Sequence, residues 1–423
     1  MAIDTTERAF YTCSMDTNAK LQLLADNSYF EPAEDTRLDL HPINQPAPCG
    51  HALAGLQRAV EQIRSGDNRA LDAQKSSLGI HNAVMPGGKT IALLKTMLTS
   101  ACERDCYYCP FRKGRDMRRA TFQPDELAKT FSELNQAHVA EGLFLSSGLA
   151  GGGVRTQDQL LDAIDILRAK HQYRGYVHLK IMPGSERAQV SRAMQLADRI
   201  SINLEAPNTR RLADLAPHKI FLEELLKPLR WADEIRRTQA PHLGWNGQWP
   251  SLVTQFVVGA VGESDLEILS TTAYLIKKLR LARAYFSAFS PVSNTPLENK
   301  PAENPWREHR LYQSSFLLRD YGFDLADLPF AQNGFLPLEV DPKVAWAQQN
   351  LADKPIELNR ADRRELLRVP GIGPKGVESI LTARRTGTLR DLKDLKAIGV
   401  LAQRAAPFVL LNGRRPNWQL SLW

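Results

Sequence analysis

Between residues 86 and 340, short apolar runs alternate with longer amphipathic patterns. The short runs are rich in β-branched and aromatic residues and predict six strands, at 91–98, 142–147, 175–181, 199–204, 252–259 and 283–289. The amphipathic patterns at 125–138 and 156–171 predict helices between strands. Strands that alternate with helices are typical of a parallel α/β sheet. Six such units predict a partial (β/α)6 barrel of the TIM type.

The pattern changes on both sides of this region. Residues 1–85 contain scattered polar turns and the proline-rich stretch HPINQPAPCG, which predicts a helical and irregular N-terminal extension. Residues 341–358 read as a linker. Residues 359–415 carry two short helical patterns joined by PGIGPK, which predicts a small all-α domain. We therefore expect a barrel domain at 86–340 with an extension before it and a helical domain after it.

Composition is that of an ordinary globular protein, with 43% hydrophobic and 24% charged residues in 423. The N-terminus, MAIDTTERAF, lacks the apolar region of a signal peptide. No apolar run reaches the roughly 18 residues of a membrane span. Three of the five cysteines are clustered, which suits a reducing compartment. We expect a cytoplasmic protein that does not associate with membranes.

The formal net charge of +7 is unevenly distributed. Between Arg360 and Arg415 there are 13 Lys and Arg against 5 Asp and Glu, so this segment accounts for the whole excess. A basic appendage on a nearly neutral body predicts a module that binds a polyanion. A merely solvated basic surface is the alternative.

Cys102, Cys106 and Cys109 form the stretch CERDCYYC, a C-x3-C-x2-C spacing. Three thiolates this close can bind three irons of a [4Fe–4S] cluster and leave the fourth iron open to a small molecule. A structural zinc site uses four ligands, usually as two pairs, and the remaining Cys13 and Cys49 stand alone. Zinc-binding or buried thiols remain the alternatives. The motif directly follows the first predicted strand, where barrel enzymes place active-site residues.

With Tyr108 just before the third cysteine, the motif resembles that of the radical S-adenosylmethionine superfamily. This resemblance implies a [4Fe–4S] cluster whose open iron binds S-adenosylmethionine. It also implies reductive cleavage of that cofactor to a 5′-deoxyadenosyl radical, with an electron from a reductant such as flavodoxin or ferredoxin. The protein's share of such chemistry is to position the cofactor and exclude water.

The resemblance extends to the ends of other predicted strands. Ser146, Ser147 and Gly148 stand where the superfamily has a Gly-Gly-Glu segment, but here no acidic residue is present, so carbonyls or serine hydroxyls would hold the cofactor's amino group. VVGAVGESD resembles a segment that lies along the adenosine. Glu205 would contact the cofactor, with a structural salt bridge as the alternative. The cofactor-binding positions are then Tyr108, Ser146, Ser147, Gly148, Glu205, Gly259 and Gly262.

A basic stretch, FRKGRDMRRA at 111–120, follows the cysteines. Arginine favours phosphate through bidentate hydrogen bonds, so we expect this stretch to contact nucleic-acid phosphates. A solvated loop with one arginine bound to the cofactor's carboxylate is the alternative. The cations are Arg112, Lys113, Arg115, Arg118 and Arg119.

The PGIGPK hairpin in the basic C-terminal segment predicts an anion site. Gly371 and Gly373 permit a tight turn whose amides converge at the start of the next helix, and Lys375 adds a charge there. The segment resembles the helix-hairpin-helix module, which grips duplex DNA phosphates without reading sequence. A degenerate second copy with Gly399 follows. A purely structural helical hairpin is the alternative.

Over most of its length the chain resembles a radical S-adenosylmethionine family described as DNA modification or repair proteins, with a C-terminal helix-hairpin-helix domain. We therefore expect an enzyme that uses a 5′-deoxyadenosyl radical on duplex DNA. Radical chemistry on RNA or on a protein side chain is one alternative. A non-catalytic iron–sulfur DNA-binding protein is another. The sequence identifies no catalytic residue beyond the cysteines, and no lesion or base.

Overall fold

The computed structural model describes residues 15–27, 77–85 and 88–417. Cys13, Cys49 and most of the predicted N-terminal extension lie outside these ranges. The chain divides into two compact units. The first comprises Met1–Leu204, Leu212–Gln255 and Pro291–Lys300, and the second Glu205–Arg211, Phe256–Ser290 and Pro301–Trp423. The four predicted domain ranges stay predictions.

Seven strands form the main sheet in sequential order. Strands β2 to β6 pair in parallel, each with the next, and β1 pairs antiparallel with β2. The α/β class and the six predicted strands are confirmed, whereas β1 was missed because its polar centre, His81 and Asn82, breaks the apolar pattern. The strands are β1 (Ile80–Val84), β2 (Thr90–Met97), β3 (Gly142–Ser146), β4 (Tyr176–Lys180), β5 (Arg199–Ser201), β6 (Ser251–Val258) and β7 (Arg283–Ala288).

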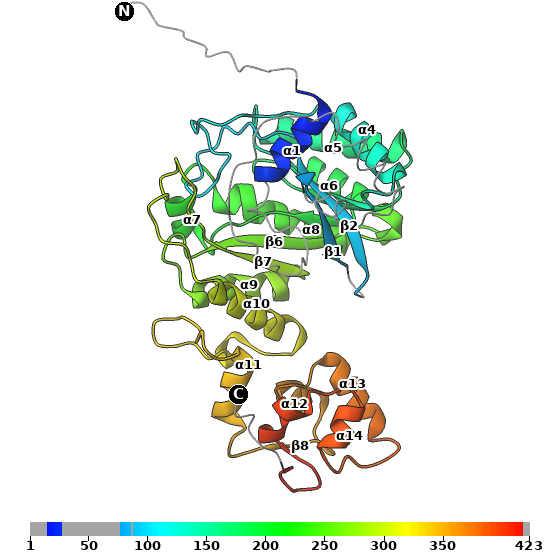
Figure 1. Cartoon of the computed structure of the whole chain (residues 1–423), viewed down its shortest axis with the longest axis vertical. Coiled ribbons are helices and arrows are strands. Elements are labelled where there is room, and N and C mark those ends of the chain that lie inside the picture. The colour runs from blue at the N-terminus through cyan, green and yellow to red at the C-terminus, as the bar shows by residue number, and fades with distance from the viewer. Residues whose placement is uncertain (1–14, 28–76, 86–87, 418–423) are drawn as a thin grey trace, which may run out of the picture. The chain divides into compact units, whose positions relative to one another are not determined.

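Helices follow the strands of the first unit and pack side by side, as Figure 1 shows. The helix predicted at 125–138 is α4, which buries Leu127, Phe131 and Leu134 along one face and begins with a capping box at Gln123. The helix predicted at 156–171 is α5. These helices are α4 (Pro124–Gln136), α5 (Gly153–Ala169), α6 (Arg187–Leu196) and α8 (Lys227–Thr238), whereas α1 (Thr17–Asn27) precedes β1 and packs against β2.

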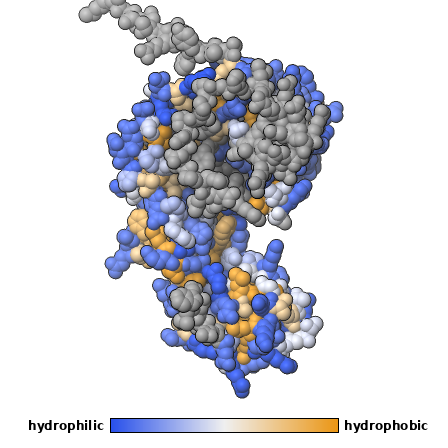
Figure 2. Space-filling model, viewed as in Figure 1, coloured by the Kyte–Doolittle hydropathy of each residue, from blue (hydrophilic) through white to orange (hydrophobic). Residues whose placement is uncertain are grey.

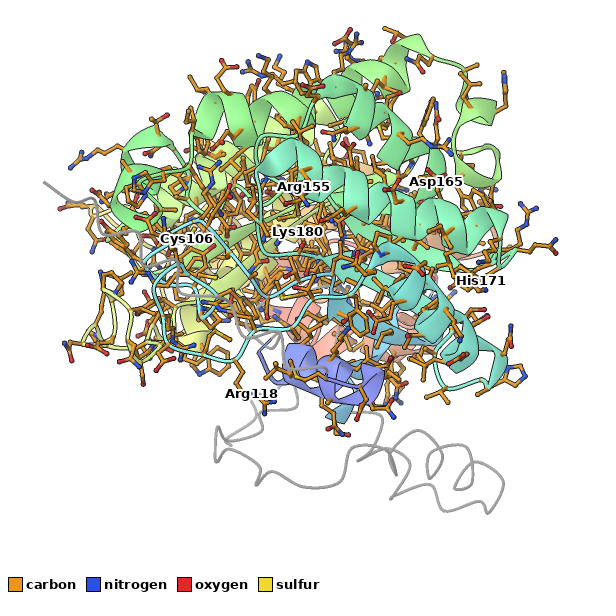
Figure 3. All side chains as sticks on the ribbon, turned by 90° about the horizontal axis from the view of Figure 1, so that it is seen from above. Cys106, Arg118, Arg155, Asp165, His171 and Lys180 are labelled. Carbon is orange, nitrogen blue, oxygen red and sulfur yellow. The ribbon has the colours of Figure 1, made fainter. Side chains whose placement is uncertain are left out.

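The register of the parallel strands determines which loops meet. Met97 lies opposite Ser146, and Lys180 lies opposite Ser201. The strands therefore end at a common edge, where the loops after β2, β3 and β4 emerge. In Figure 3, Cys106 lies toward the end at which α5 begins near Arg155, whereas His171, beyond the end of α5, lies on the opposite side. The cysteines thus occupy the carboxyl edge of the sheet, as in other parallel α/β proteins with functional loops.

In the second unit, two long helices, α9 (Asp265–Leu279) and α10 (Pro305–Asp320), pack against each other, and α10 also packs against β7. The C-terminal segment (Figure 1, orange to red) is built from short helices and has its own apolar cluster, which includes Leu366, Ile372 and Ile380. A parallel pair, β8 (Ile356–Glu357) and β9 (Val409–Leu410), joins its two ends. Its helices are α11 (Pro342–Asn350), α12 (Arg363–Arg368), α13 (Pro374–Ala383), α14 (Leu392–Ala397) and α15 (Ala402–Ala405).

The visible surface of the described residues is mostly hydrophilic, with scattered hydrophobic patches (Figure 2). Ile220, Trp306 and Leu401 are among the exposed large apolar side chains. Among the described helices, none combines the length and the apolar character that crossing a bilayer requires.

Candidate functional site

The cysteine loop, residues 98–110, starts where β2 ends and is tied to the neighbouring strand. The amide of Leu98 donates to the Ser146 carbonyl at 2.8 Å, and the amide of Gly148 donates to the Thr99 carbonyl at 2.7 Å. A side chain at Gly148 would collide with the carbonyl oxygen of Ala101. Glycine is therefore required at 148 so that the β3 edge can approach the loop. This position was predicted to bind the cofactor, and its steric role is to admit the cysteine loop.

The three cysteines of this loop form no disulfide bond. Cys106 is buried, and Cys102 and Cys109 are half-buried. Burial raises the pKa of the Cys109 thiol, and the neighbouring thiols of Cys106 and Cys102 raise it further, while the Phe111 amide and Lys219 act in the opposite direction. The three sulfurs are thus close enough to disfavour one another's charge. A bound cation would relieve that repulsion and keep them as thiolates.

The chemistry of the three donors suits an iron–sulfur cluster. Within the described part of the chain, no three His, Cys, Asp or Glu side chains are grouped as ligands of one metal ion. A cubane instead takes one thiolate at each of several separate irons. Three thiolates on one loop suit three corners of a [4Fe–4S] cluster, and the fourth corner would need a ligand that is not a cysteine of this loop.

Arg119 holds the cysteine loop from one side. Its guanidinium donates to four main-chain carbonyls, those of Ser100, Phe111, Arg112 and Arg115, at 2.6 to 3.4 Å. Burial lowers the pKa of Arg119, although the thiols of Cys102 and Cys109 act in the opposite direction. Its positive charge therefore lies near the sulfurs, and its main role in this structure is to fix the loop.

The other cations of the basic stretch 111–120 differ in how far they are engaged. Arg115 donates to the carbonyls of Ser293 and Pro110, at 3.0 and 2.9 Å. Arg112 is half-buried, and its Nε finds no hydrogen-bond partner among the described residues. Lys113 and Arg118 are exposed, and Figure 3 shows Arg118 at the periphery. Contact with phosphates stays a prediction for this stretch, and Lys113 and Arg118 are the cations with freedom to make it.

The glycine-rich segment after β3 is held by an acidic residue that the sequence analysis overlooked. Glu103, directly after the first cysteine, accepts hydrogen bonds from the amides of Gly151 and Gly152 at 3.1 and 3.3 Å. The Ser146 hydroxyl donates to the Thr96 carbonyl at 3.5 Å. The Ser147 hydroxyl is buried and has no partner in the parts of the chain that the structure describes. Ser147 is therefore the side chain of this segment best able to accept a ligand.

Tyr108 is half-buried in the cysteine loop. The remaining predicted cofactor positions belong to the second unit. Glu205 is buried and has a positive φ of 65°, a strained conformation that is often found at functional sites. Its carbonyl accepts from the Val257 amide at 2.8 Å.

Gly259 and Gly262 also have positive φ, and a side chain at Gly259 would collide with the carboxylate of Glu303. Glu303, rather than open space, faces Gly259.

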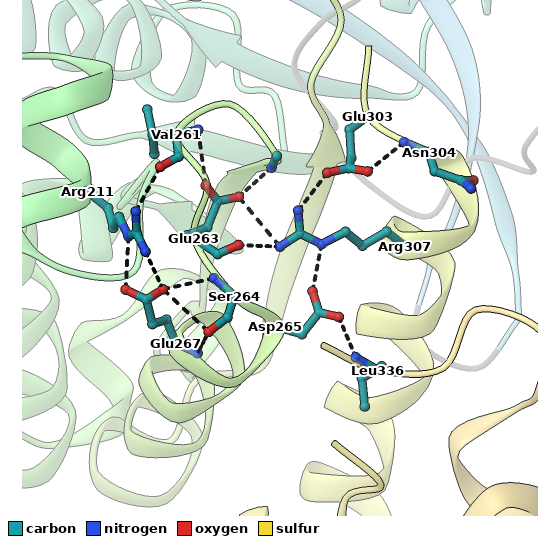
Figure 4. A network of polar contacts seen from close by, with 11 residues as sticks. Arg211, Val261, Glu263, Ser264, Asp265, Glu267, Glu303, Asn304, Arg307 and Leu336 are labelled. Atoms are coloured by element: carbon teal, nitrogen blue, oxygen red, sulfur yellow. Dashed lines mark hydrogen bonds and ion pairs between the residues drawn. The ribbon is translucent and has the colours of Figure 1, made fainter. Parts of the chain in front are cut away.

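A buried ionic network fixes the segment 259–263 (Figure 4). The Glu263 carboxylate accepts from the amides of Gly259 and Val261. Arg307 donates to Asp265 at 2.7 Å, to Glu303 at 2.6 Å and to the Glu263 carbonyl at 2.6 Å. Burial disfavours the charge of Arg307, but these carboxylates outweigh that effect and its pKa is raised.

Beside this network, Arg211 bonds to Glu267 through two nitrogens and to the Val261 carbonyl at 2.9 Å. The hydrogen bond from Arg211 lowers the pKa of Glu267 to about 2, with smaller contributions from Ser264 and Asn208. The motif glycines were visible in the sequence, whereas no sequence signal pointed to Arg307 or Glu303.

The C-terminal hairpin, residues 369–373, joins α12 to α13. Gly371 has a φ of 82°, and a side chain there would lie 2.6 Å from the Leu401 carbonyl. Gly373 caps α13 without any side-chain hydrogen bond, and Lys375 is exposed in the first turn. A second turn at Gly399, with a φ of 82°, joins α14 to α15. Each of these turns joins two short helices, and their assignment to the helix-hairpin-helix module stays a prediction.

No protein-family model matches the chain, and no curated protein does. Several solved structures align with part of the chain. Methylornithine synthase (PylB) aligns with a TM-score of 0.42 and 14% identity, over 54% of this chain and 62% of that one. The [FeFe]-hydrogenase maturase HydG from Carboxydothermus hydrogenoformans aligns with a TM-score of 0.43 and 15% identity, over 63% and 64%.

The cobalamin-dependent S-adenosylmethionine radical enzyme OxsB aligns with a TM-score of 0.35 and 11% identity, over 72% of this chain and 51% of that one. The chain covers less than two thirds of each of these three proteins.

The ionic network yields a stability prediction. Arg307→Met should leave the carboxylates of Glu263 and Asp265 buried without their cation, at a cost of about 3–5 kcal/mol. Urea unfolding followed by circular dichroism measures it. Arg187→Met is the matched control, because Arg187 forms an exposed ion pair with Glu234 at 2.9 Å and should cost at most ~1 kcal/mol. Equal shifts of the two unfolding midpoints would contradict the role of the network.

Proposed function

We propose that the protein is an iron–sulfur enzyme of the radical S-adenosylmethionine type that acts on duplex DNA. The observation that carries the proposal is the trio of cysteine thiols, none of them in a disulfide, on one loop at the carboxyl edge of a parallel sheet. Cys102, Cys106 and Cys109 would hold three irons of a [4Fe–4S] cluster. When bound, that cluster with S-adenosylmethionine supplies one-electron cleavage to a 5′-deoxyadenosyl radical.

The chain's own residues would position the cofactor. Arg119 fixes the cysteine loop through its carbonyl contacts and places a positive charge near the sulfurs. Ser147 offers a buried hydroxyl for the cofactor's amino group, in place of an acidic residue. The burial of Cys106 limits access of water to the loop. Tyr108, Glu205, Gly259 and Gly262 remain proposed cofactor contacts.

Duplex DNA is the proposed substrate because of the C-terminal segment. The hairpin 369–373 leads into a helix whose first turn has no side-chain cap, so its amides and the dipole of α13 favour an anion. Lys375 adds an exposed charge. We infer that this helix-hairpin-helix arrangement grips phosphates without reading sequence, and that Lys113 and Arg118 add phosphate contacts beside the cysteine loop. The electron would come from a reductant such as flavodoxin or ferredoxin.

The enzymatic proposal is tested by 5′-deoxyadenosine formation. Anaerobically reconstituted, reduced protein should form this product from S-adenosylmethionine, and duplex DNA should increase its yield. Cys102→Ala, Cys106→Ala and Cys109→Ala should each lose the product and the cluster absorbance, because one iron loses its ligand. Cys49→Ala, outside the motif, should retain both.

Each alternative gives a different result in this assay. Product stimulated by RNA and not by duplex DNA would move the substrate to RNA. Absence of product from protein with an intact cluster would refute the enzyme and favour an iron–sulfur DNA-binding protein.

The hairpin proposal is tested by the salt dependence of DNA binding. Lys375→Ala should weaken binding to all duplexes alike and reduce the slope of log K against log salt by about 1, because one phosphate contact is lost. Fluorescence anisotropy at several salt concentrations measures it. Lys278→Ala removes another exposed charge, from α9, and should leave the slope unchanged. The same slope in both variants would contradict phosphate binding at this hairpin.

A further inference from the structure

Lys343, in the first turn of α11, is a buried lysine that bonds to the hairpin. The residue is 8% exposed. The ammonium donates to the carbonyl oxygen of Ile372 at 2.6 Å and lies 4.5 Å from the centre of the Tyr321 ring. Lysine is rarely buried unless it is paired with a carboxylate. Here its hydrogen-bond acceptor is a carbonyl, at the tip of the proposed phosphate-binding turn.

Other contacts of the hairpin also engage its main-chain carbonyls. The Gly371 carbonyl accepts from the Leu401 amide at 3.3 Å, and the Val369 carbonyl accepts from the Ile372 amide at 3.2 Å. The Tyr321 hydroxyl packs beside Gly373, 3.1 Å from where a side chain would begin. These contacts engage the carbonyls of the hairpin. The amides of Gly371 and Gly373 have no acceptor in the described residues.

We propose that Lys343 is a positioning residue for the phosphate grip, holding the Ile372 carbonyl inward so that the neighbouring amides face the ligand, and that phosphate binding is coupled to protonation of its amine. The inference rests on the proposed DNA-binding function of the hairpin. The phosphate would bind at these amides, across one turn of the chain from the Lys343 amine. Its negative charge would then lie close to that amine. Its attraction favours the ammonium over the neutral amine, so binding takes up a proton.

The environment of Lys343 places this coupling in an accessible pH range. Burial lowers the pKa of Lys343 to about 7, and Arg404 and Arg368 lower it too, while Asp341 acts in the opposite direction. Charged and titratable groups lie around it on the neighbouring elements: Asp341 at the start of α11, Tyr321 at the end of α10, Arg368 on α12 and Arg404 on α15. Burial raises the pKa of Tyr321, which keeps its hydroxyl neutral.

These charges determine the direction in which DNA affinity changes with pH. Below about pH 7 the amine is protonated in both free and bound protein, and binding takes up no proton. Above that pH the free protein loses the proton while the bound protein retains it. DNA affinity should therefore fall as the pH rises above 7, by up to about tenfold per pH unit.

The test measures duplex DNA affinity of the full chain by fluorescence anisotropy between pH 6 and 8.5 at constant salt. The wild type should lose affinity above pH 7. Lys343→Arg should keep the affinity measured at pH 6 and show a flat profile, because a guanidinium does not titrate in this range. Lys343→Met should bind more weakly at pH 6 and be equally flat. Lys278→Ala, on α9, should keep the wild-type profile.

The results separate the role of Lys343 from DNA binding by the hairpin. A flat wild-type profile, or a wild-type slope retained in Lys343→Arg, would overturn the role of Lys343 while leaving DNA binding in place. Failure of the wild type to bind duplex DNA at every pH would overturn the proposed function of the hairpin, and the inference with it. Circular dichroism at each pH checks folding. If Lys343→Met is unfolded, the profile of Lys343→Arg decides.

Discussion

Three irregular segments of this protein are each held by one buried or half-buried charged side chain bonded to the main chain. Arg119 donates to four carbonyls around the cysteine loop, Glu263 accepts from amides of the segment 259–263, and Lys343 donates to the Ile372 carbonyl. A buried loop leaves polar main-chain groups without the partners that a helix or strand supplies, which is costly. Charged groups make the stronger hydrogen bonds, so a single side chain can fix several residues of loop.

Such hydrogen bonds to the main chain give the cations near the cysteines a different role from the one predicted. A basic stretch beside a predicted active site suggested phosphate contacts for all five of its cations. In the structure, Arg115 and Arg119 hold main-chain carbonyls, and only Lys113 and Arg118 among the five are exposed. The positive charge beside the sulfurs is thus largely part of the loop's own architecture. It also favours thiolates, which a cluster requires.

The sequence predicted the periodic elements and the local motifs well. Six strands and two helices follow from hydrophobic patterning, because burial of one face imposes its period on the chain. Cys102, Cys106 and Cys109 were recognisable because their spacing is local. Strand β1 was missed, because its centre is polar. Arg307 and Lys343 were missed for another reason: each acts on a segment 29 to 44 residues away, and no local pattern records such a partner.

The two glycine-rich segments show how partners that the sequence does not reveal alter the proposed site. Their glycines suggested backbone open to a flat ligand. Instead, the chain supplies its own carboxylates: Glu103 accepts from two amides of the first segment, and Glu263 accepts from two of the second. Amides that already donate to a carboxylate offer little to a cofactor's carboxylate or phosphate. Recognition at the first segment would therefore rely on the Ser147 hydroxyl, whose oxygen suits a ligand that presents an ammonium group.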